Sequence, residues 1–180
     1  MGSGKSTIGK ELARRLDRAF IDTDERIETA QKMEIIEIFA KKGEAWFRIY
    51  EEKVVHELIS SARQAVISLG GGTLLSQKTT DFVLASGILI YIKSEPEEIY
   101  KRIKHSSRRP LLRLEGNVWQ KKAYMERVAQ LMRQREKGYA HAHICIDRDG
   151  KEVNEIVDEI VNKLSGFQVN PTDKKSKKIK

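Results

Sequence analysis

The chain of 180 residues has a single cysteine and no long apolar run. One cysteine, Cys145, cannot form an internal disulfide, which favours a reducing, cytoplasmic setting and a thiol buried on an apolar strand. No apolar run approaches the roughly 20 residues that cross a bilayer. The N-terminus also lacks the basic and apolar segments of a cleaved secretory signal. We therefore expect neither a membrane span nor a membrane partner.

Positive charge is in excess, but half of the net excess lies in the last ten residues. The formal net charge is +8, and residues 171–180 contain five lysines and one aspartate. A lysine-rich segment with few apolar residues is typical of a disordered tail, which we predict at residues 167–180. We expect no nucleic-acid partner, and binding of nucleic acid through the tail is the weaker alternative. The remaining length suits one domain, residues 1–166, and its modest positive charge suits a polyanionic small molecule.

Short apolar runs alternate with segments of helical periodicity, which predicts an α/β fold. Continuous apolar runs are typical of parallel strands buried on both faces. The predicted strands are 19–21, 65–69, 87–92 and 143–146, and the predicted helices are 7–16, 35–39, 45–62, 97–104, 121–137 and 152–164. Ser94 and Glu97 predict a capping box at one helix start. A basic segment at residues 104–117, which carries Pro110 and Gly116, predicts a loop or lid between two helices.

A glycine-rich phosphate-binding motif opens the chain. Gly2-Ser3-Gly4-Lys5-Ser6-Thr7, followed by a helix, is the second half of a Walker A loop. Backbone N–H groups and the helix N-terminus of such a loop bind phosphate oxygens, the lysine adds charge, and the hydroxyl after it binds Mg²⁺. The first glycine of the full motif and the strand that normally feeds it would both precede Met1. We therefore expect that the first strand of the fold is missing from the sequence as given.

Two carboxylates follow the first predicted strand. Asp22 and Asp24 are two residues apart, so on extended backbone both side chains project to the same side at the ligand-binding end of a parallel sheet. The two negative carboxylates repel one another unless a cation or a proton lies between them. One acid then suits a hydrated Mg²⁺ and the other a substrate hydroxyl. The alternative is that these acids cap a helix.

Four further motifs could bind an anionic ligand. Arg48 and Glu51 share one face of a helix, either as a ligand clamp or as a surface ion pair. Three glycines after the second strand allow a close backbone approach, or form a plain turn. Arg109 lies in the predicted lid, and Arg135, four residues before Tyr139, could by itself be a cation that complements a helix dipole.

These motifs occur in order over residues 1 to about 165 and together resemble the shikimate kinase family, relatives of the nucleoside monophosphate kinases. They are Gly2 to Thr7, Asp22-Thr23-Asp24 with Ile27-Glu28, Phe47-Arg48 with Glu51, Ser68 to Thr73, Arg109-Pro110-Leu111-Leu112, and Arg135 with Tyr139. The resemblance implies a three-layer P-loop kinase fold, with a parallel sheet flanked by helices, a substrate-binding segment at about 24–52 and a lid at about 104–117. It also implies a monomer that phosphorylates the 3-hydroxyl of shikimate with ATP and Mg²⁺, on the route to chorismate and aromatic amino acids.

The resemblance also implies a role for each motif. Asp24, Lys5 and Arg109 would be catalytic, and Ser6 and Asp22 would hold Mg²⁺. Nucleotide would be bound by Gly2, Ser3, Gly4, Lys5, Ser6, Thr7, Arg102 and Arg109. Shikimate would be bound by Asp24, Arg48, Gly70, Gly71, Gly72 and Arg135, with Glu51 orienting Arg48. Two rival functions stay open: another small-molecule P-loop kinase, such as a gluconate kinase, and a non-catalytic nucleotide-binding module.

Overall fold

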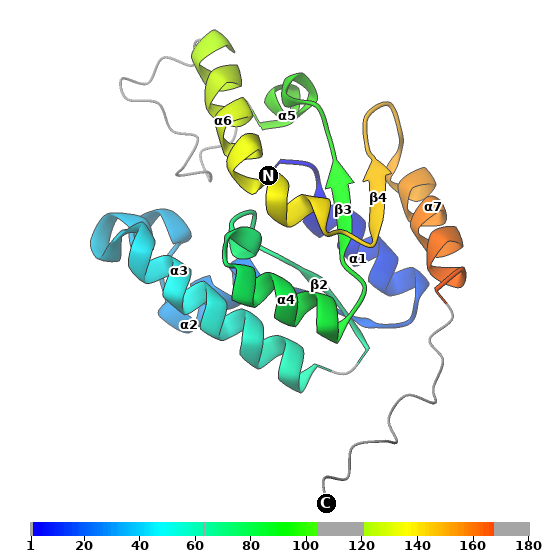
Figure 1. Cartoon of the computed structure of the whole chain (residues 1–180), viewed down its shortest axis with the longest axis horizontal. Helices are drawn as coiled ribbons and strands as arrows, with labels where there is room; N and C mark the ends of the chain where they lie inside the picture. The colour runs from blue at the N-terminus through cyan, green and yellow to red at the C-terminus, as the bar shows by residue number, and fades with distance from the viewer. Residues whose placement is uncertain (1, 63, 104–120, 168–180) are drawn as a thin grey trace, which may run out of the picture.

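The computed structural model describes residues 2–62, 64–103 and 121–167, in which four short strands alternate with helices (Figure 1). The strands are β1 (Ala19–Asp22), β2 (Ala65–Ser68), β3 (Ile90–Lys93) and β4 (Ile144–Asp147). The helices are α1 (Lys5–Arg15), α2 (Thr23–Gln31), α3 (Ile35–Ser61), α4 (Gln77–Ser86), α5 (Pro96–Ile103), α6 (Lys121–Ala140) and α7 (Val153–Ser165), with a short 3₁₀ turn, η1 (Thr73–Leu75).

The strands form two parallel pairs. In the first pair Ala19 of β1 lies opposite Ala65 of β2, and in the second Ile90 of β3 lies opposite Ile144 of β4. Among the described residues no ladder joins β2 to β3. Both strands instead line one cavity of about 650 Å³. The prediction of parallel strands is confirmed, with the sheet divided at this cavity.

Helices cover both faces of the strands. On one face α1 and α7 pack against β4 through a core that includes Leu12, Ile146 and Ile156, all at most 5% exposed. On the other face Val55 of α3 and Val83 of α4 form a second buried cluster with residues beside β3. The layers are therefore helix, strand and helix, as predicted. No helix in the described part of the chain is long and apolar enough to cross a membrane.

Several local predictions need correction. β4 alternates buried and exposed residues, so Cys145 points to solvent rather than into the core. The sequence pattern also missed α2 and α4. A distant residue, Asp149, takes the part expected of Glu97 in the predicted capping box. The Ser94 hydroxyl donates to the Asp149 carboxylate, and this carboxylate also accepts the Glu95 backbone N–H at 2.6 Å. The two helices predicted at 35–39 and 45–62 meet in α3, which is broken at Gly43 (φ 81°).

Two predicted segments fall on residues that the structure does not describe. The whole of the predicted lid at 104–117, including Arg109, lies outside the described residues, and so does the predicted tail from residue 168 onward. The boundary predicted at residue 166 lies just after α7, which ends at Ser165.

Candidate active site

The glycine-rich motif forms a loop that leads directly into α1. Gly2 and Gly4 have φ angles of 62° and 84°, in the left-handed region that favours glycine. Gly4 is the N-cap of α1, and Lys5 is the first helical residue. The free N–H groups and positive dipole end of this helix therefore lie beside Lys5 and Ser6, which is the arrangement that binds phosphate.

Ser6 and Asp22 meet at the end of β1. The Ser6 hydroxyl donates a hydrogen bond of 2.6 Å to Asp22 Oδ2, while Oδ1 accepts the Asp24 and Glu25 N–H groups at 3.0 and 3.4 Å. Asp22 therefore caps α2, and Asp24 lies in the first helical turn rather than on extended backbone. The alternative that these acids cap a helix is therefore confirmed for Asp22, which also contacts Ser6 of the phosphate loop.

A hydroxyl and a carboxylate are oxygen ligands of the kind that Mg²⁺ prefers. In the described ranges no group of three His, Cys, Asp or Glu side chains could hold a metal ion. Mg²⁺ usually takes one or two protein ligands and completes its shell with water and substrate phosphates, so this small donor set fits it.

The three-glycine turn after β2 is fixed by two hydroxyl groups. Thr23, fully buried at the start of α2, donates to the Ser68 carbonyl at 3.2 Å and accepts the Gly70 N–H at 2.9 Å. The Tyr139 hydroxyl of α6 donates to the Gly71 carbonyl at 3.1 Å. Thr23 was given no role in the sequence-based prediction, although it stands within the Asp22-Thr23-Asp24 motif.

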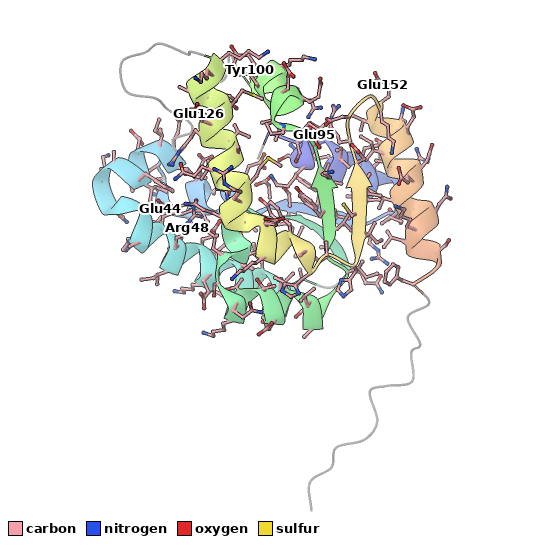
Figure 2. The ribbon with its side chains drawn as sticks, turned by 45° about the horizontal axis from the view of Figure 1, so that its top comes forward. Glu44, Arg48, Glu95, Tyr100, Glu126 and Glu152 are labelled. Carbon is pink, nitrogen blue, oxygen red and sulfur yellow. The ribbon has the colours of Figure 1, made fainter. Side chains whose placement is uncertain are left out.

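Arg48 and Glu51 form a largely buried ion pair rather than a surface one. Glu51 is 2% exposed, and its Oε2 accepts a hydrogen bond from Arg48 Nη1 at 2.8 Å. Thr73 donates to its other oxygen at 3.1 Å. Glu44, one turn earlier on α3, accepts from Arg48 Nε and Nη2 at 3.3 and 3.0 Å, and Figure 2 shows Glu44 and Arg48 close together. Glu44 and Thr73 had no role in the sequence-based prediction.

Burial dominates the electrostatics of Glu51. Desolvation raises the pKa of this carboxyl, and the negative charge of Asp24 adds to the rise. The Arg48 guanidinium and the Thr73 hydroxyl act in the opposite direction without cancelling it. Asp24 and Glu51 are thus two acids of one site.

Each glycine of the turn makes room for a different functional side chain. A Cβ at Gly70 would overlap Glu51 Oε1 and lie 2.9 Å from Asp24 Oδ1. A Cβ at Gly71 would lie 2.7 Å from Arg135 Nη1, and one at Gly72 would overlap the Arg48 guanidinium.

The structure therefore brings all the described residues of the predicted shikimate set to this turn: Asp24, Arg48, Gly70, Gly71, Gly72 and Arg135. Two arginines that reach one glycine turn are suited to bind a carboxylate or a similar anion.

Arg102 lies in a separate cluster with Ser94 and Asp149. Its Nη2 donates to Asp149 at 2.7 Å and its Nη1 to the Ser94 hydroxyl at 2.9 Å. The neighbouring Arg148 reaches within 3.9 Å of the position of a Cβ on Gly4. Arg102 is therefore held by Asp149, which the sequence pattern did not identify and whose neighbour Arg148 lies beside the phosphate loop.

The fold and the site together define the class of protein. A phosphate-binding glycine loop that opens α1, parallel strands between helices, and an acid at the carboxyl end of β1 are the features of a P-loop kinase.

Comparison with known proteins identifies the family. The family model for shikimate kinase matches residues 1–165. The chain is 40% identical to a shikimate kinase of Deinococcus radiodurans over 91% of this chain and 79% of that protein. It is 39% identical to that of Thermus thermophilus over 91% of this chain and 85% of the relative. This chain belongs to the shikimate kinase family.

Solved structures agree with this assignment. A shikimate kinase from Acinetobacter baumannii in complex with shikimate superposes with a TM-score of 0.85 at 30% identity, covering 94% of this chain and 90% of that one. One from Aquifex aeolicus has a TM-score of 0.76 at 34% identity, covering 92% of each chain. The predicted family and P-loop kinase fold are confirmed.

Proposed function

We propose that this protein transfers the γ-phosphoryl group of ATP to the 3-hydroxyl of shikimate, with Mg²⁺, giving shikimate 3-phosphate. Family membership supports the reaction. The observation that carries the assignment of roles is the convergence of Asp24, Arg48 and Arg135 on a glycine turn. The Ser6–Asp22 contact lies at the start of the adjoining helix, α2.

The nucleotide side of the site rests on the α1 loop. Lys5 and the N–H groups from Gly2 to Ser6 would hold the β- and γ-phosphates, and Ser6 and Asp22 would hold Mg²⁺, Asp22 through water. The metal neutralises negative charge on the phosphate oxygens when it is bound. Arg102 would contact the base, and Arg109, outside the described residues, would close over the phosphates by analogy with the family.

The substrate side rests on the glycine turn. Arg48 and Arg135 would bind the shikimate carboxylate through paired N–H groups, with Gly71 and Gly72 at the same anion. Glu51 is 2% exposed and holds Arg48 in place. Asp24 would accept the proton of the 3-hydroxyl as that oxygen attacks phosphorus, and general-base assistance of this kind contributes about 10²–10⁴ in rate.

A coupled assay of ADP release tests the proposal. The protein is offered ATP and Mg²⁺ with shikimate, gluconate or a nucleoside monophosphate in turn. We expect turnover with shikimate alone, and loss of that turnover in the Asp24→Asn and Arg48→Ala variants. Turnover with gluconate but not shikimate would replace the substrate. Binding of ATP and shikimate without turnover would indicate a non-catalytic nucleotide-binding module.

A further inference from the structure

Two carboxylates divide the guanidinium of Arg48 between them. Glu51 accepts from Nη1 at 2.8 Å, while a single oxygen of Glu44, Oε1, accepts from both Nε and Nη2, at 3.3 and 3.0 Å. The Nε and Nη2 N–H groups form one edge of the planar guanidinium, and an edge of this kind binds the two oxygens of a carboxylate in parallel. Glu44, which lies beside Arg48 in Figure 2, therefore occupies an edge that a ligand carboxylate can also use.

The two carboxylates differ in how firmly they are held. The Glu51 side chain is 3% exposed, and its other oxygen accepts from the Thr73 hydroxyl. The Glu44 side chain is 50% exposed, and within the described residues its hydrogen bonds go to Arg48. Glu44 also follows Gly43, where α3 is broken and where a Cβ would meet no atom within 4 Å. Glu44 can therefore turn into water at little cost, whereas removing Glu51 from Arg48 would leave a buried charge unpaired.

The charges around Arg48 and the glycine turn disfavour a further anion. Arg48 and Arg135 supply two positive charges. Asp24, Glu44 and Glu51 supply up to three negative ones. A substrate carboxylate that joined all three acids would meet like charges in a partly desolvated site, which is unfavourable. Glu44 is the most exposed of the three acids, so its departure is the easiest way to relieve this repulsion.

We propose that Glu44 and the carboxylate of the substrate compete for the Nε–Nη2 edge of Arg48, so that binding of one displaces the other. Glu51 stays in place and keeps the guanidinium oriented during the exchange. This inference rests on the proposed function and adds to it a residue that sets the affinity for shikimate. A competitor and a positioning residue differ in sign: removing the charge of a competitor tightens binding, whereas removing that of a positioning residue weakens it.

Isothermal titration calorimetry of the full chain with shikimate, without nucleotide, measures this sign. Glu44→Gln removes the negative charge and keeps the size of the side chain. We expect its Kd for shikimate to be about 2- to 5-fold lower than that of the unchanged protein, which is the range that a partly exposed ion pair contributes. In steady-state assays the KM for shikimate should fall by a similar factor.

Glu57→Gln is the matched control. Glu57 also lies on α3 and pairs with Lys53 four residues earlier at 3.8 Å, but it is more than two helical turns beyond Arg48. We expect it to leave the Kd unchanged. Equal tightening by Glu57→Gln would indicate a general effect of net charge and overturn the proposal.

The unchanged protein separates the remaining outcomes. If it binds shikimate and Glu44→Gln leaves the Kd unchanged or raises it, Glu44 is not a competitor, and this inference alone is overturned. If the unchanged protein does not bind shikimate, the proposed function fails, and the inference fails with it.

Discussion

Replacing Gly72 by alanine tests how the glycine turn positions Arg48. The backbone at Gly72 (φ −106°) suits any residue, so alanine strains no dihedral angle. The added Cβ would overlap the Arg48 guanidinium and must displace it. The substitution therefore acts on the Arg48 side chain of the proposed carboxylate site and keeps the backbone N–H of Gly72.

The magnitude follows from the contacts that Arg48 makes. A hydrogen bond to a charged group contributes about 1.5–3 kcal/mol, and 1.4 kcal/mol is tenfold in affinity. Loss of the Arg48 contact to the substrate carboxylate should thus raise the KM for shikimate about 10- to 100-fold. Displacing Arg48 from the buried carboxylate of Glu51 should also lower the free energy of unfolding by about 1–2 kcal/mol. For a chain of this size, each kcal/mol lost lowers Tm by roughly 2–4 °C.

Steady-state kinetics with shikimate and with ATP as the varied substrate provide the assay, and thermal unfolding provides the stability. Gly87→Ala is the matched control, because a Cβ at Gly87 meets no atom within 4 Å and its φ is −175°. We expect the control to leave both KM values unchanged, and Gly72→Ala to leave the KM for ATP unchanged.

The double variant Gly72→Ala with Arg48→Ala makes the test specific. If Gly72 acts through Arg48, adding Gly72→Ala to Arg48→Ala should change the KM for shikimate little further, because neighbouring residues that share one interaction are not additive. An unchanged KM in Gly72→Ala, or full additivity in the double variant, would refute the reasoning.

Three further predictions concern the acids of the site. Asp24→Asn should lower kcat at least about 100-fold while calorimetry shows ATP still binding, since the lost function is general-base assistance. The raised pKa of Glu51 means that the folded chain holds its proton above the ordinary value of 4.5, so stability should fall as pH rises through the raised pKa. Thermal melts between pH 4 and 7 should show this slope, and Glu51→Gln should flatten it. Asp149→Ala removes a hydrogen-bond partner of Arg102 and should raise the KM for ATP about 3- to 10-fold without changing that for shikimate.

The sequence predicted the phosphate loop and the glycine turn well because both depend on short spacings. The motif from Gly2 to Thr7 predicted a loop that opens a helix, and the structure has that loop with α1 beginning at Lys5, two residues before the predicted start. The helices α2 and α4 were missed because their buried faces are short or polar. Thr23 and Ile27 are the buried residues of α2, and two of the three in α4 are threonines, so neither segment shows an apolar repeat.

Residues that act across the fold could not be found by spacing. Asp149 meets Ser94 across 55 residues, and Thr73 meets Glu51 across 22. A single threonine or aspartate between two elements has no local signature, so its role depends on which elements the fold brings together. The placement of Asp24 was wrong for a related reason: once Asp22 caps α2, the next residues are helical and the extended backbone assumed for the pair does not continue.

The glycine turn explains why carboxylates and arginines from three helices can share one small site. Asp24 comes from α2, Arg48 and Glu51 from α3, and Arg135 from α6, and each approaches the turn where a side chain is absent. A β-carbon at any of the three glycines would push against a different partner. The backbone of these three residues therefore sets the separation of all the partners. Because Glu51 is buried and its pKa is raised, its charge depends on Arg48 staying in place. The turn therefore controls both the position of the anion-binding arginines and the protonation of the acid beside them.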